Sequence, residues 1–177
     1  MDIPFFEGNG FYLRELRESD LEGNWYNWFN DSRVTMYQNK KIFPNTRGNQ
    51  RDYFEKLKSS NSDIVFAIIE KETNEHIGNV GLHHIDWVHS SAELGIVIGE
   101  TEYYGKKIGK QAWKLITEYG FSTLNLHRIY ALIMTNNIVS IKCAEAAGFI
   151  CEGKIRDYFY KNGVYEKVCY YNIIKSG

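Results

Sequence analysis

Strand-like runs of hydrophobic residues occupy the middle of the chain. Residues 64–69, 76–82 and 92–98 form three such runs, separated by polar or glycine-bearing turns. This spacing predicts an antiparallel meander of three strands. Near the beginning of the chain, residues 10–16 alternate between hydrophobic and polar positions, which is typical of a further strand.

Four segments have apolar residues at the spacing that is typical of helices. A short helix is predicted after the capping pair at 19–20, and a second helix after Thr46. The most regular pattern covers residues 108–121, and the last covers residues 137–148.

The remainder of the chain adds an apolar run at 128–134 and, from Phe149 onward, two strands around the Asn162-Gly163 turn. The predicted order is therefore β, α, α, β, β, β, α, β, α, β, β, without a repeat or an interdomain linker. With 177 residues, 44% of them hydrophobic, the chain is long enough for one core. We expect a single α/β domain over residues 1–177, with a mixed sheet flanked by helices.

Charge and composition exclude several classes of function. The formal net charge of -1 gives no field that would hold a polyanion, so nucleic acid is not an expected partner. Residues 1–6 lack a basic region followed by an apolar stretch, and apolar runs such as 129–134 fall far short of a bilayer span, so no membrane association is expected. The three cysteines form no Cys-x-x-Cys pair, which favours the reducing cytoplasm.

Glycines and lysines open the long helix predicted at 108–121. The residues of interest are Gly105, Lys106, Lys107, Ile108, Gly109 and Lys110. A helix start offers free backbone N–H groups and a positive dipole end, which bind phosphate; a turn with solvated lysines is the alternative. The two glycines are too close for a nucleoside-triphosphate loop, and Gln111 stands where Ser or Thr would hold magnesium, so a diphosphate without a metal fits better.

Three further polar residues are candidates for chemistry. Glu93 interrupts the apolar strand at 92–98, where a half-buried carboxylate must be paired, solvated or functional. Asn137 and Ser140 open the last predicted helix, and taken alone they are best explained as helix caps.

Taken in order, these features resemble the GNAT superfamily of N-acetyltransferases, and in particular the branch with ribosomal-protein N-terminal acetyltransferases and spermidine acetyltransferases. The resemblance covers nearly the whole chain, through residues 11–14, Asp20, residues 92–95, 105–109 and 124–129, the Asn-x-x-Ser at 137–140, Gly148-Phe149, Glu152-Gly153 and Asn162-Gly163. It implies an acyltransferase that moves an acetyl group from acetyl-CoA to a primary amine. It also implies a mixed, mostly antiparallel sheet with a V-shaped splay, flanked by about four helices.

The resemblance assigns residues to the binding of acetyl-CoA, the expected co-substrate. The residues expected to contact it are Ile96, Val97 and Ile98 on the strand, Gly105, Lys106, Lys107, Ile108, Gly109 and Lys110 at the helix start, and Asn137 and Ser140. Two positions depart from the family's pattern, since Tyr104 replaces a Gln or Arg and Lys107 replaces a glycine. No metal is expected.

The resemblance also implies a mechanism. An aliphatic ammonium group has a pKa of roughly 10.4, so it must lose a proton before it attacks the thioester, and Glu93 is the expected base, through a water. A strand N–H within residues 94–96 would stabilise the oxyanion. Many relatives place a proton-donating tyrosine where this chain has Ala144, so Ser140 is the expected donor to the leaving thiolate.

In relatives, residues corresponding to 25–58 and some later aromatic residues form the acceptor groove. The residues expected to line it here are Trp25, Trp28, Phe29, His84, Trp87 and Tyr158. His83 and His84 are neighbours on a predicted strand and should point to opposite faces, so at most one of them is expected to face the substrate.

Basic residues outnumber acidic ones in this part of the chain: Arg33, Lys40, Lys41, Arg47, Arg51, Lys56 and Lys58. A polyamine pocket should instead be lined by carboxylates, so a small-molecule amine is expected first, for example a nucleotide-linked amino sugar. A ribosomal-protein N-terminus is the second candidate and a polyamine a further one, although a solvated helix face explains the pattern equally well. A CoA-binding module without turnover is the alternative from another class. Relatives are often dimers, which favours a homodimer.

Overall fold

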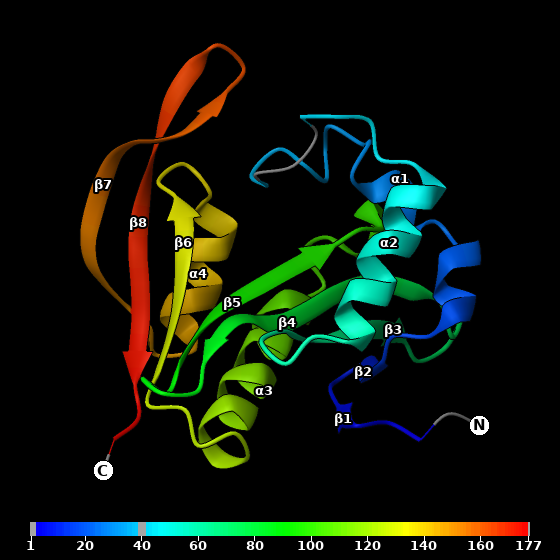
Figure 1. Ribbon diagram of the computed structural model, residues 1–177, viewed down its shortest axis with the longest axis horizontal. Coiled ribbons are helices and arrows are strands. Elements are labelled where there is room, and N and C mark those ends of the chain that lie inside the picture. The colour runs from blue at the N-terminus through cyan, green and yellow to red at the C-terminus, as the bar shows by residue number, and fades with distance from the viewer. Residues whose placement is uncertain (1–2, 39–41, 177) are drawn as a thin grey trace.

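The structure, a computed structural model, describes residues 3–38 and 42–176. Within these residues, eight strands form one sheet in the order β1-β2-β3-β4-β5-β6-β8-β7 (Figure 1). The strands are β1 (Phe6–Glu7), β2 (Phe11–Glu15), β3 (Ile64–Glu70), β4 (His76–Asp86), β5 (Ser91–Ile98), β6 (Arg128–Met134), β7 (Ile150–Lys161) and β8 (Val164–Ile174). The helices are α1 (Trp25–Trp28), α2 (Arg47–Lys58), α3 (Ile108–Ser122) and α4 (Ile138–Ala146). None of the helices in the described ranges is both long and apolar enough to cross a membrane.

The sheet is antiparallel except between β5 and β6. These strands run parallel and pair over three positions, from Ser91 opposite Arg128 to Glu93 opposite Tyr130. Beyond Glu93 they diverge, and Figure 1 shows β5 leaning away from β6 toward α1. The predicted architecture is confirmed: a mixed, mostly antiparallel sheet with a V-shaped splay and flanking helices.

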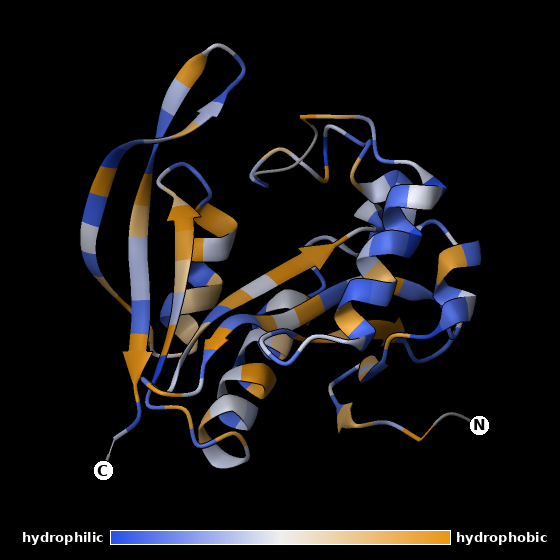
Figure 2. Ribbon diagram, viewed as in Figure 1, coloured by the Kyte–Doolittle hydropathy of each residue, from blue (hydrophilic) through white to orange (hydrophobic). Residues whose placement is uncertain are grey.

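The main core lies between α3 and the sheet. Ile108, Ala112 and Ile116 bury the face of α3 that the sequence pattern predicts, and they share one cluster with Leu82 of β4 and Leu94 of β5. Figure 2 shows hydrophobic residues prevailing along β5 and β6, whereas α2 is largely polar. This packing holds the first turns of α3 beside β5.

A smaller core forms around α1. Trp25 and Trp28 are fully buried in it, packed with Leu21, Val34 and Phe54. Neither indole can contact an acceptor, which corrects the expectation that these two tryptophans line the groove. A helix of four residues makes few backbone contacts of its own, so burial of its two indoles holds it in place.

Trp28 packs directly on the backbone that follows β5. A Cβ atom added at Gly99 would lie 1.9 Å from Trp28 Cδ2, so only glycine leaves room for the indole. Trp28 Nε1 donates a hydrogen bond to Glu100 Oε1 (2.8 Å), and Asn24 Nδ2 donates to the same oxygen (2.8 Å). Glu100 thereby holds α1 against the end of β5.

A buried ion pair joins β2 to the turn that follows it. Arg14 donates from both terminal nitrogens to the Asp20 carboxylate, at 2.8 and 2.7 Å, and the Arg17 N–H donates to Asp20 Oδ2 (2.8 Å). Burial alone would raise the pKa of Asp20, but the hydrogen bonds from Arg14 and the proximity of His76 outweigh it and hold the pKa below its usual value. The pair fixes the direction in which the chain leaves β2 toward α1.

Candidate active site

A cleft of about 550 Å³ opens where β5 and β6 diverge. Strands β4, β5 and β6 line it, together with residues of α2, the start of α4 and the β7–β8 hairpin. The residues predicted from the sequence that line it are Phe29, His84, Glu93, Ile96, Val97, Asn137, Ser140 and Tyr158. The fold therefore brings together side chains from both ends of the chain.

The first turn of α3 lies beside this cleft and fits a diphosphate. No side chain caps the helix, so the N–H groups of its first turn lack partners within the helix. A Cβ atom added at Gly109 would lie 3.9 Å from Ile96 Cδ1 and 4.0 Å from Cys143 Sγ. The N-terminus of α3, which is the positive end of its helix dipole, therefore lies close to Ile96 of β5 and Cys143 of α4.

The loop before α3 contains Lys107, which stands where the family's pattern has a glycine. Gly105 has φ +78° and Lys107 has φ +63°, so both adopt the left-handed conformation that glycine enters without strain. Lys107 keeps the loop in shape at a cost of roughly 1–2 kcal/mol and adds a charge. Lys106 is turned elsewhere, since its Nζ lies 4.2 Å from the centre of the Tyr103 ring.

The edge of β5 that faces the cleft carries main-chain groups that β6 does not pair. The pairing with β6 ends at Glu93, and the Ile96 carbonyl accepts a hydrogen bond from Gln38 Nε2 (3.2 Å). Ile98, which was expected to continue this surface, lies outside the cleft, and its carbonyl accepts a hydrogen bond from Tyr104 Oη (3.3 Å). The strand surface open to a ligand is therefore residues 94–97.

Asn137 acts as the cap of α4, as its position in the sequence suggests. Its Oδ1 accepts a hydrogen bond from the Ser140 N–H (3.1 Å). This contact uses the main chain of Ser140, and the residue itself lines the cleft.

The other end of the cleft holds two carboxylate–histidine pairs. Glu93 Oε2 lies 3.0 Å from His84 Nδ1, and Asp63 Oδ1 lies 3.0 Å from His83 Nδ1. The His84 side chain is 74% exposed and that of Glu93 29%, whereas those of His83 and Asp63 are 25% and 18% exposed. Two carboxylates, each in contact with a histidine, therefore lie together in the cleft.

Both histidines line the cleft although they are neighbours in β4. The register between β4 and β5 shifts between His83 and Asp86, and His84 has φ +51°. A left-handed residue in a bulge breaks the alternation of side chains along a strand. The expectation that at most one histidine faces this side is therefore wrong.

Asp63 is the most firmly held of these groups. Ser60 Oγ donates to its Oδ2 (2.8 Å), and Ser62 Oγ donates to the same oxygen (3.2 Å). Burial would raise the pKa of Asp63, but the hydrogen bonds from Ser60, His83 and Ser62 hold it below its usual value. Burial, together with the Asp63 charge, raises the pKa of Tyr53 to about 12.

Most basic residues between 33 and 58 are engaged away from the cleft. The contacts are Arg33 with Asp31 (2.6 Å), Arg51 with Glu18 (2.8 Å), Lys58 with Glu55 (3.1 Å), and Arg47 over the Tyr26 ring (4.3 Å). Lys56 lines the cleft, and Lys40 and Lys41 lie outside the described residues. Most of the basic residues counted in this part of the chain therefore do not line the cleft. The argument against a cationic acceptor no longer holds.

The β7–β8 hairpin closes one end of the cleft. Tyr158 and Phe159 line it. Lys161 Nζ donates to the carbonyls of Thr35 (2.8 Å) and Gln38 (2.7 Å), which ties the hairpin to the segment that precedes α2. The hairpin and this segment therefore form one connected wall.

Trp87 lies outside the cleft, on the exposed turn between β4 and β5, where its Nε1 donates to the Asn61 carbonyl (2.7 Å). Asp63 and His83 line the cleft instead, and sequence reasoning did not assign them a role. The Ser-Asn-Ser-Asp run at 60–63 is a polar cluster directly before a strand, which could have drawn attention to Asp63. The contact between Asp63 and His83, 20 positions further along the chain, cannot be predicted from residue spacing.

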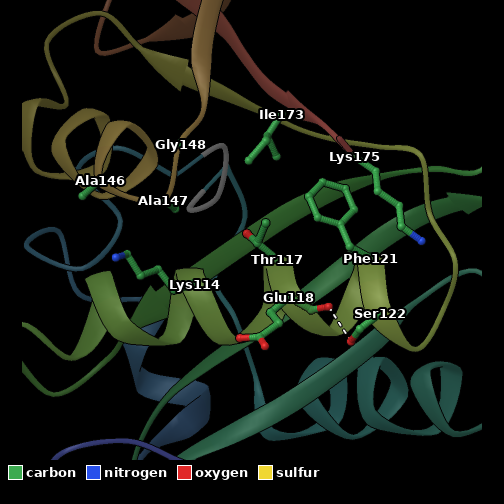
Figure 3. Close-up of a pocket in the computed structure, with 10 residues that line it drawn as sticks. All are labelled: Lys114, Thr117, Glu118, Phe121, Ser122, Ala146, Ala147, Gly148, Ile173 and Lys175. Atoms are coloured by element: carbon green, nitrogen blue, oxygen red, sulfur yellow. Dashed lines mark hydrogen bonds between the residues drawn. The ribbon is translucent and has the colours of Figure 1, made fainter. Parts of the chain in front are cut away.

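A second hollow, of about 600 Å³, lies between the later turns of α3 and the end of α4 (Figure 3). Lys114 and Glu118 of α3, Gly148 and Lys175 contribute to its wall. Figure 3 shows one hydrogen bond among the residues drawn, from Ser122 Oγ to the Glu118 carbonyl (2.8 Å). Since none of the predicted site residues lines it, the chemistry is assigned to the β5–β6 cleft.

Similar proteins identify the family. Residues 11–150 match the family described as the Acetyltransferase (GNAT) domain. The protein named Uncharacterized N-acetyltransferase p20, from Bacillus licheniformis, is 34% identical over 167 residues, covering 92% of each chain. A spermidine N(1)-acetyltransferase of Vibrio cholerae is 33% identical over 109 residues, covering 62% of each chain. The crystal structure of spermidine N-acetyltransferase from Vibrio cholerae in complex with CoA and spermine has a TM-score of 0.85 at 27% identity and covers 93% of this chain and 95% of that one. The chain therefore belongs to the GNAT family of acetyltransferases and is an acyl-transferring enzyme, as the resemblance in its sequence implies.

Proposed function

We propose that the enzyme transfers the acetyl group of acetyl-CoA to a primary amine of a small molecule, bound where Asp63 and Glu93 line the cleft. The observation that carries this proposal is the layout of the cleft, which runs from beside the uncapped start of α3 to two carboxylates. A helix N-terminus suits a diphosphate, and carboxylates suit an ammonium group. The Vibrio cholerae relative was solved with CoA and spermine, which are ligands of these two kinds.

The residues beside the cleft fit acetyl-CoA, which supplies the thioester. The first turn of α3, with Lys107 and Lys110, would bind the pyrophosphate. The main chain at residues 94–97 would hydrogen-bond the pantetheine, and Gln38 would first release the Ile96 carbonyl. The Ile96 N–H lies on the same edge of the strand as its carbonyl and is the proposed donor to the developing oxyanion.

Glu93 is the proposed acceptor of the proton that the ammonium group loses. One of its oxygens is held by His84, and its side chain is partly open to the cleft, so the other oxygen can contact the amine or a bridging water. Ser140 is the proposed donor to the leaving thiolate, whose intrinsic pKa is roughly 8.5. Its place at the start of α4 stabilises negative charge nearby.

The cleft favours a small cationic amine. Asp63 and Glu93 provide negative charge, Phe29, Tyr37 and Tyr158 provide aromatic surface, and Lys56 adds a positive charge to the lining. A nucleotide-linked amino sugar would need more basic contacts than this lining offers. A polyamine is the favoured example of such an amine, because this lining and the spermidine-acetylating relatives both favour it.

A panel of amines tests the proposal. Release of the CoA thiol would be measured with spermidine, spermine, an amino sugar and a peptide N-terminus, alongside calorimetry of acetyl-CoA binding. We expect binding, and turnover with at least one small amine, preferentially a polyamine. Acetyl-CoA binding without turnover of any small amine, or turnover of the peptide alone, would contradict the proposed acceptor class.

We also propose that the protein associates with copies of itself. Ile150, Ile155 and Tyr160 on the edge strand β7 are exposed, and a long exposed edge strand with apolar side chains can pair with another chain. One structure of the Vibrio cholerae relative is described as dodecameric. Light scattering coupled to gel filtration would test this, and a monomer at all concentrations would contradict it.

A further inference from the structure

We propose that His83, held by Asp63, is a second proton acceptor in the cleft and acts on the nitrogen of the acceptor amine together with Glu93. The proposal rests on the proposed N-acetyl transfer. His83 would be a catalytic residue, because its Nε2 would touch the substrate or a water bound to it, whereas Asp63 would be a positioning residue.

The tautomer of His83 follows from its partner. Asp63 is ionised at neutral pH, since its hydrogen bonds keep its pKa low, and an ionised carboxylate can only accept hydrogen bonds. Nδ1 of His83, 3.0 Å from Asp63 Oδ1, must therefore carry the proton. Nε2 then has a free lone pair, and the part of the chain that the structure describes offers it no hydrogen-bond partner.

The position of His83 brings this lone pair to the reacting strand. His83 stands opposite Glu93 in the β4–β5 pairing. A Cβ atom added at Gly95 would lie 3.0 Å from His83 Cδ2 and 3.2 Å from Nε2. The imidazole therefore lies against the main chain of β5, next to the residues proposed to bind the thioester, and the absence of a side chain at Gly95 leaves space for it.

His84 is the weaker candidate for this role, although it too is paired. Its side chain is 74% exposed, against 25% for His83, and its Nδ1 contacts Glu93 rather than a separate carboxylate. It is better suited to orienting Glu93 than to accepting a proton from the amine.

Several charged and titratable groups face His83. Asp63 precedes β3, and Glu93 lies on β5; both carry negative charge. Helix α2 contributes Tyr53, which stays neutral, and Lys56, the positive group at this end of the cleft. His84 of β4 and Tyr158 of the hairpin complete the set. The imidazole therefore shares the cleft with two carboxylates and one lysine.

The proposed steps account for both protons that leave the nitrogen. An ammonium nitrogen has three protons and the amide product has one, so two must leave. Glu93 takes the first, and the free amine forms the C–N bond with the thioester carbon. His83 Nε2 takes the second proton from the nitrogen, while the C–S bond breaks with its electron pair on sulfur. The sulfur gains a proton from Ser140 or solvent, and the enzyme groups return to their starting states by exchange with solvent, with one net proton released.

Three variants test the assignment: His83→Gln, Asp63→Asn and, as a matched control, His89→Gln. His89 Nδ1 lies 2.8 Å from Asp86 Oδ2, so it forms a similar pair, but on the exposed turn outside the cleft. The measurements are kcat and kcat/KM from about pH 5.5 to about pH 9.5, thermal unfolding, and calorimetry of acetyl-CoA binding.

We expect His83→Gln to lower kcat by about 10²-fold or more and to remove the loss of activity on the acid side, with unchanged acetyl-CoA affinity. Asp63→Asn should move that acid limb to lower pH, because a neutral partner stabilises the imidazolium less. His89→Gln should match the wild type. A wild-type pH profile in active His83→Gln, or a change in KM alone, would overturn the proposal.

A second measurement does not depend on the folding of a variant. Nitrogen chemical shifts of the His83 imidazole in the wild-type protein report its tautomer, and we expect a proton on Nδ1 and none on Nε2 near neutral pH. The opposite tautomer would overturn the proposal while leaving the proposed function intact. Conversely, if the wild type and His89→Gln bind acetyl-CoA but release no CoA thiol with any amine, the proposed function fails and this inference falls with it.

Discussion

Gly99→Ala tests whether the packing of Trp28 on the end of β5 holds α1 in place. The new Cβ would lie 1.9 Å from Trp28 Cδ2 and 2.1 Å from Cε2, whereas carbon atoms normally approach to about 3.5 Å or more, so the ring must shift by roughly 1.5 Å. Overpacking a core costs about 1–3 kcal/mol, and the shift also weakens the hydrogen bond to Glu100, of a kind that contributes about 1.5–3 kcal/mol. We expect the free energy of unfolding to fall by about 2–4 kcal/mol.

Urea denaturation followed by circular dichroism would measure this loss. Gly153→Ala is the matched control, because no atom lies within 4 Å of a Cβ added there, and its effect should stay within about 0.5 kcal/mol. If Gly99→Ala cost no more than the control, the indole would not be held against Gly99 as described, and the account of how α1 is fixed would fail.

Three further changes test the site and the fold. Glu93→Gln should lower kcat/KM most near neutral pH, with a defect that shrinks toward the amine pKa of roughly 10.4; a pH–rate profile parallel to wild type would contradict the role of base. Gly109→Val should weaken acetyl-CoA binding in calorimetry without unfolding the protein, because its methyl groups enter the space beside Ile96; unchanged affinity would remove the diphosphate assignment. Asp20→Asn should lower the free energy of unfolding by about 3–5 kcal/mol at neutral pH, because the charge of the buried Arg14 is no longer balanced by a carboxylate. Since folding lowers the pKa of Asp20, its contribution is present above the pKa of the unfolded carboxyl and is lost as pH falls below about 4. The difference between wild type and variant in urea denaturation should therefore shrink in acid, and a constant difference would argue against the ion pair as its source.

The arrangement of the elements was predictable because each leaves a local pattern. The three strand-like hydrophobic runs became β3, β4 and β5, and the apolar face at 108–121 became α3. The positions of Asn137 and Glu93 were also readable, since a cap and a carboxylate in an apolar strand are local anomalies.

Errors arose where the outcome depends on contacts between distant segments. Trp25 and Trp28 suit a groove or a core equally well, and their packing with residues such as Phe54 decides for the core. The bulge at His84 has no sequence signal as strong as glycine, yet it places both histidines in the cleft. The lysines and arginines of residues 33–58 gave a misleading sum, because ion pairs hold Arg33, Arg51 and Lys58 away from the site and a ring contact holds Arg47.

Because β5 and β6 pair over only three positions, this pairing can act as a hinge between two halves of the sheet, β1 to β5 and β6 to β8. The β5–β6 pairing at residues 91–93 joins the two halves at the closed end of the V. Contacts between α3 and α4 connect the helices that flank the sheet. A small rotation about such a hinge moves its distant ends most, so Val97 and Met134 would separate further than Ala92 and Ile129. A ligand that bonds both half-sheets would close a gap that the polypeptide leaves open. Filling the cleft should therefore stiffen the whole sheet, so amide exchange should slow in β6 and β8 as well as in the strand that the ligand contacts.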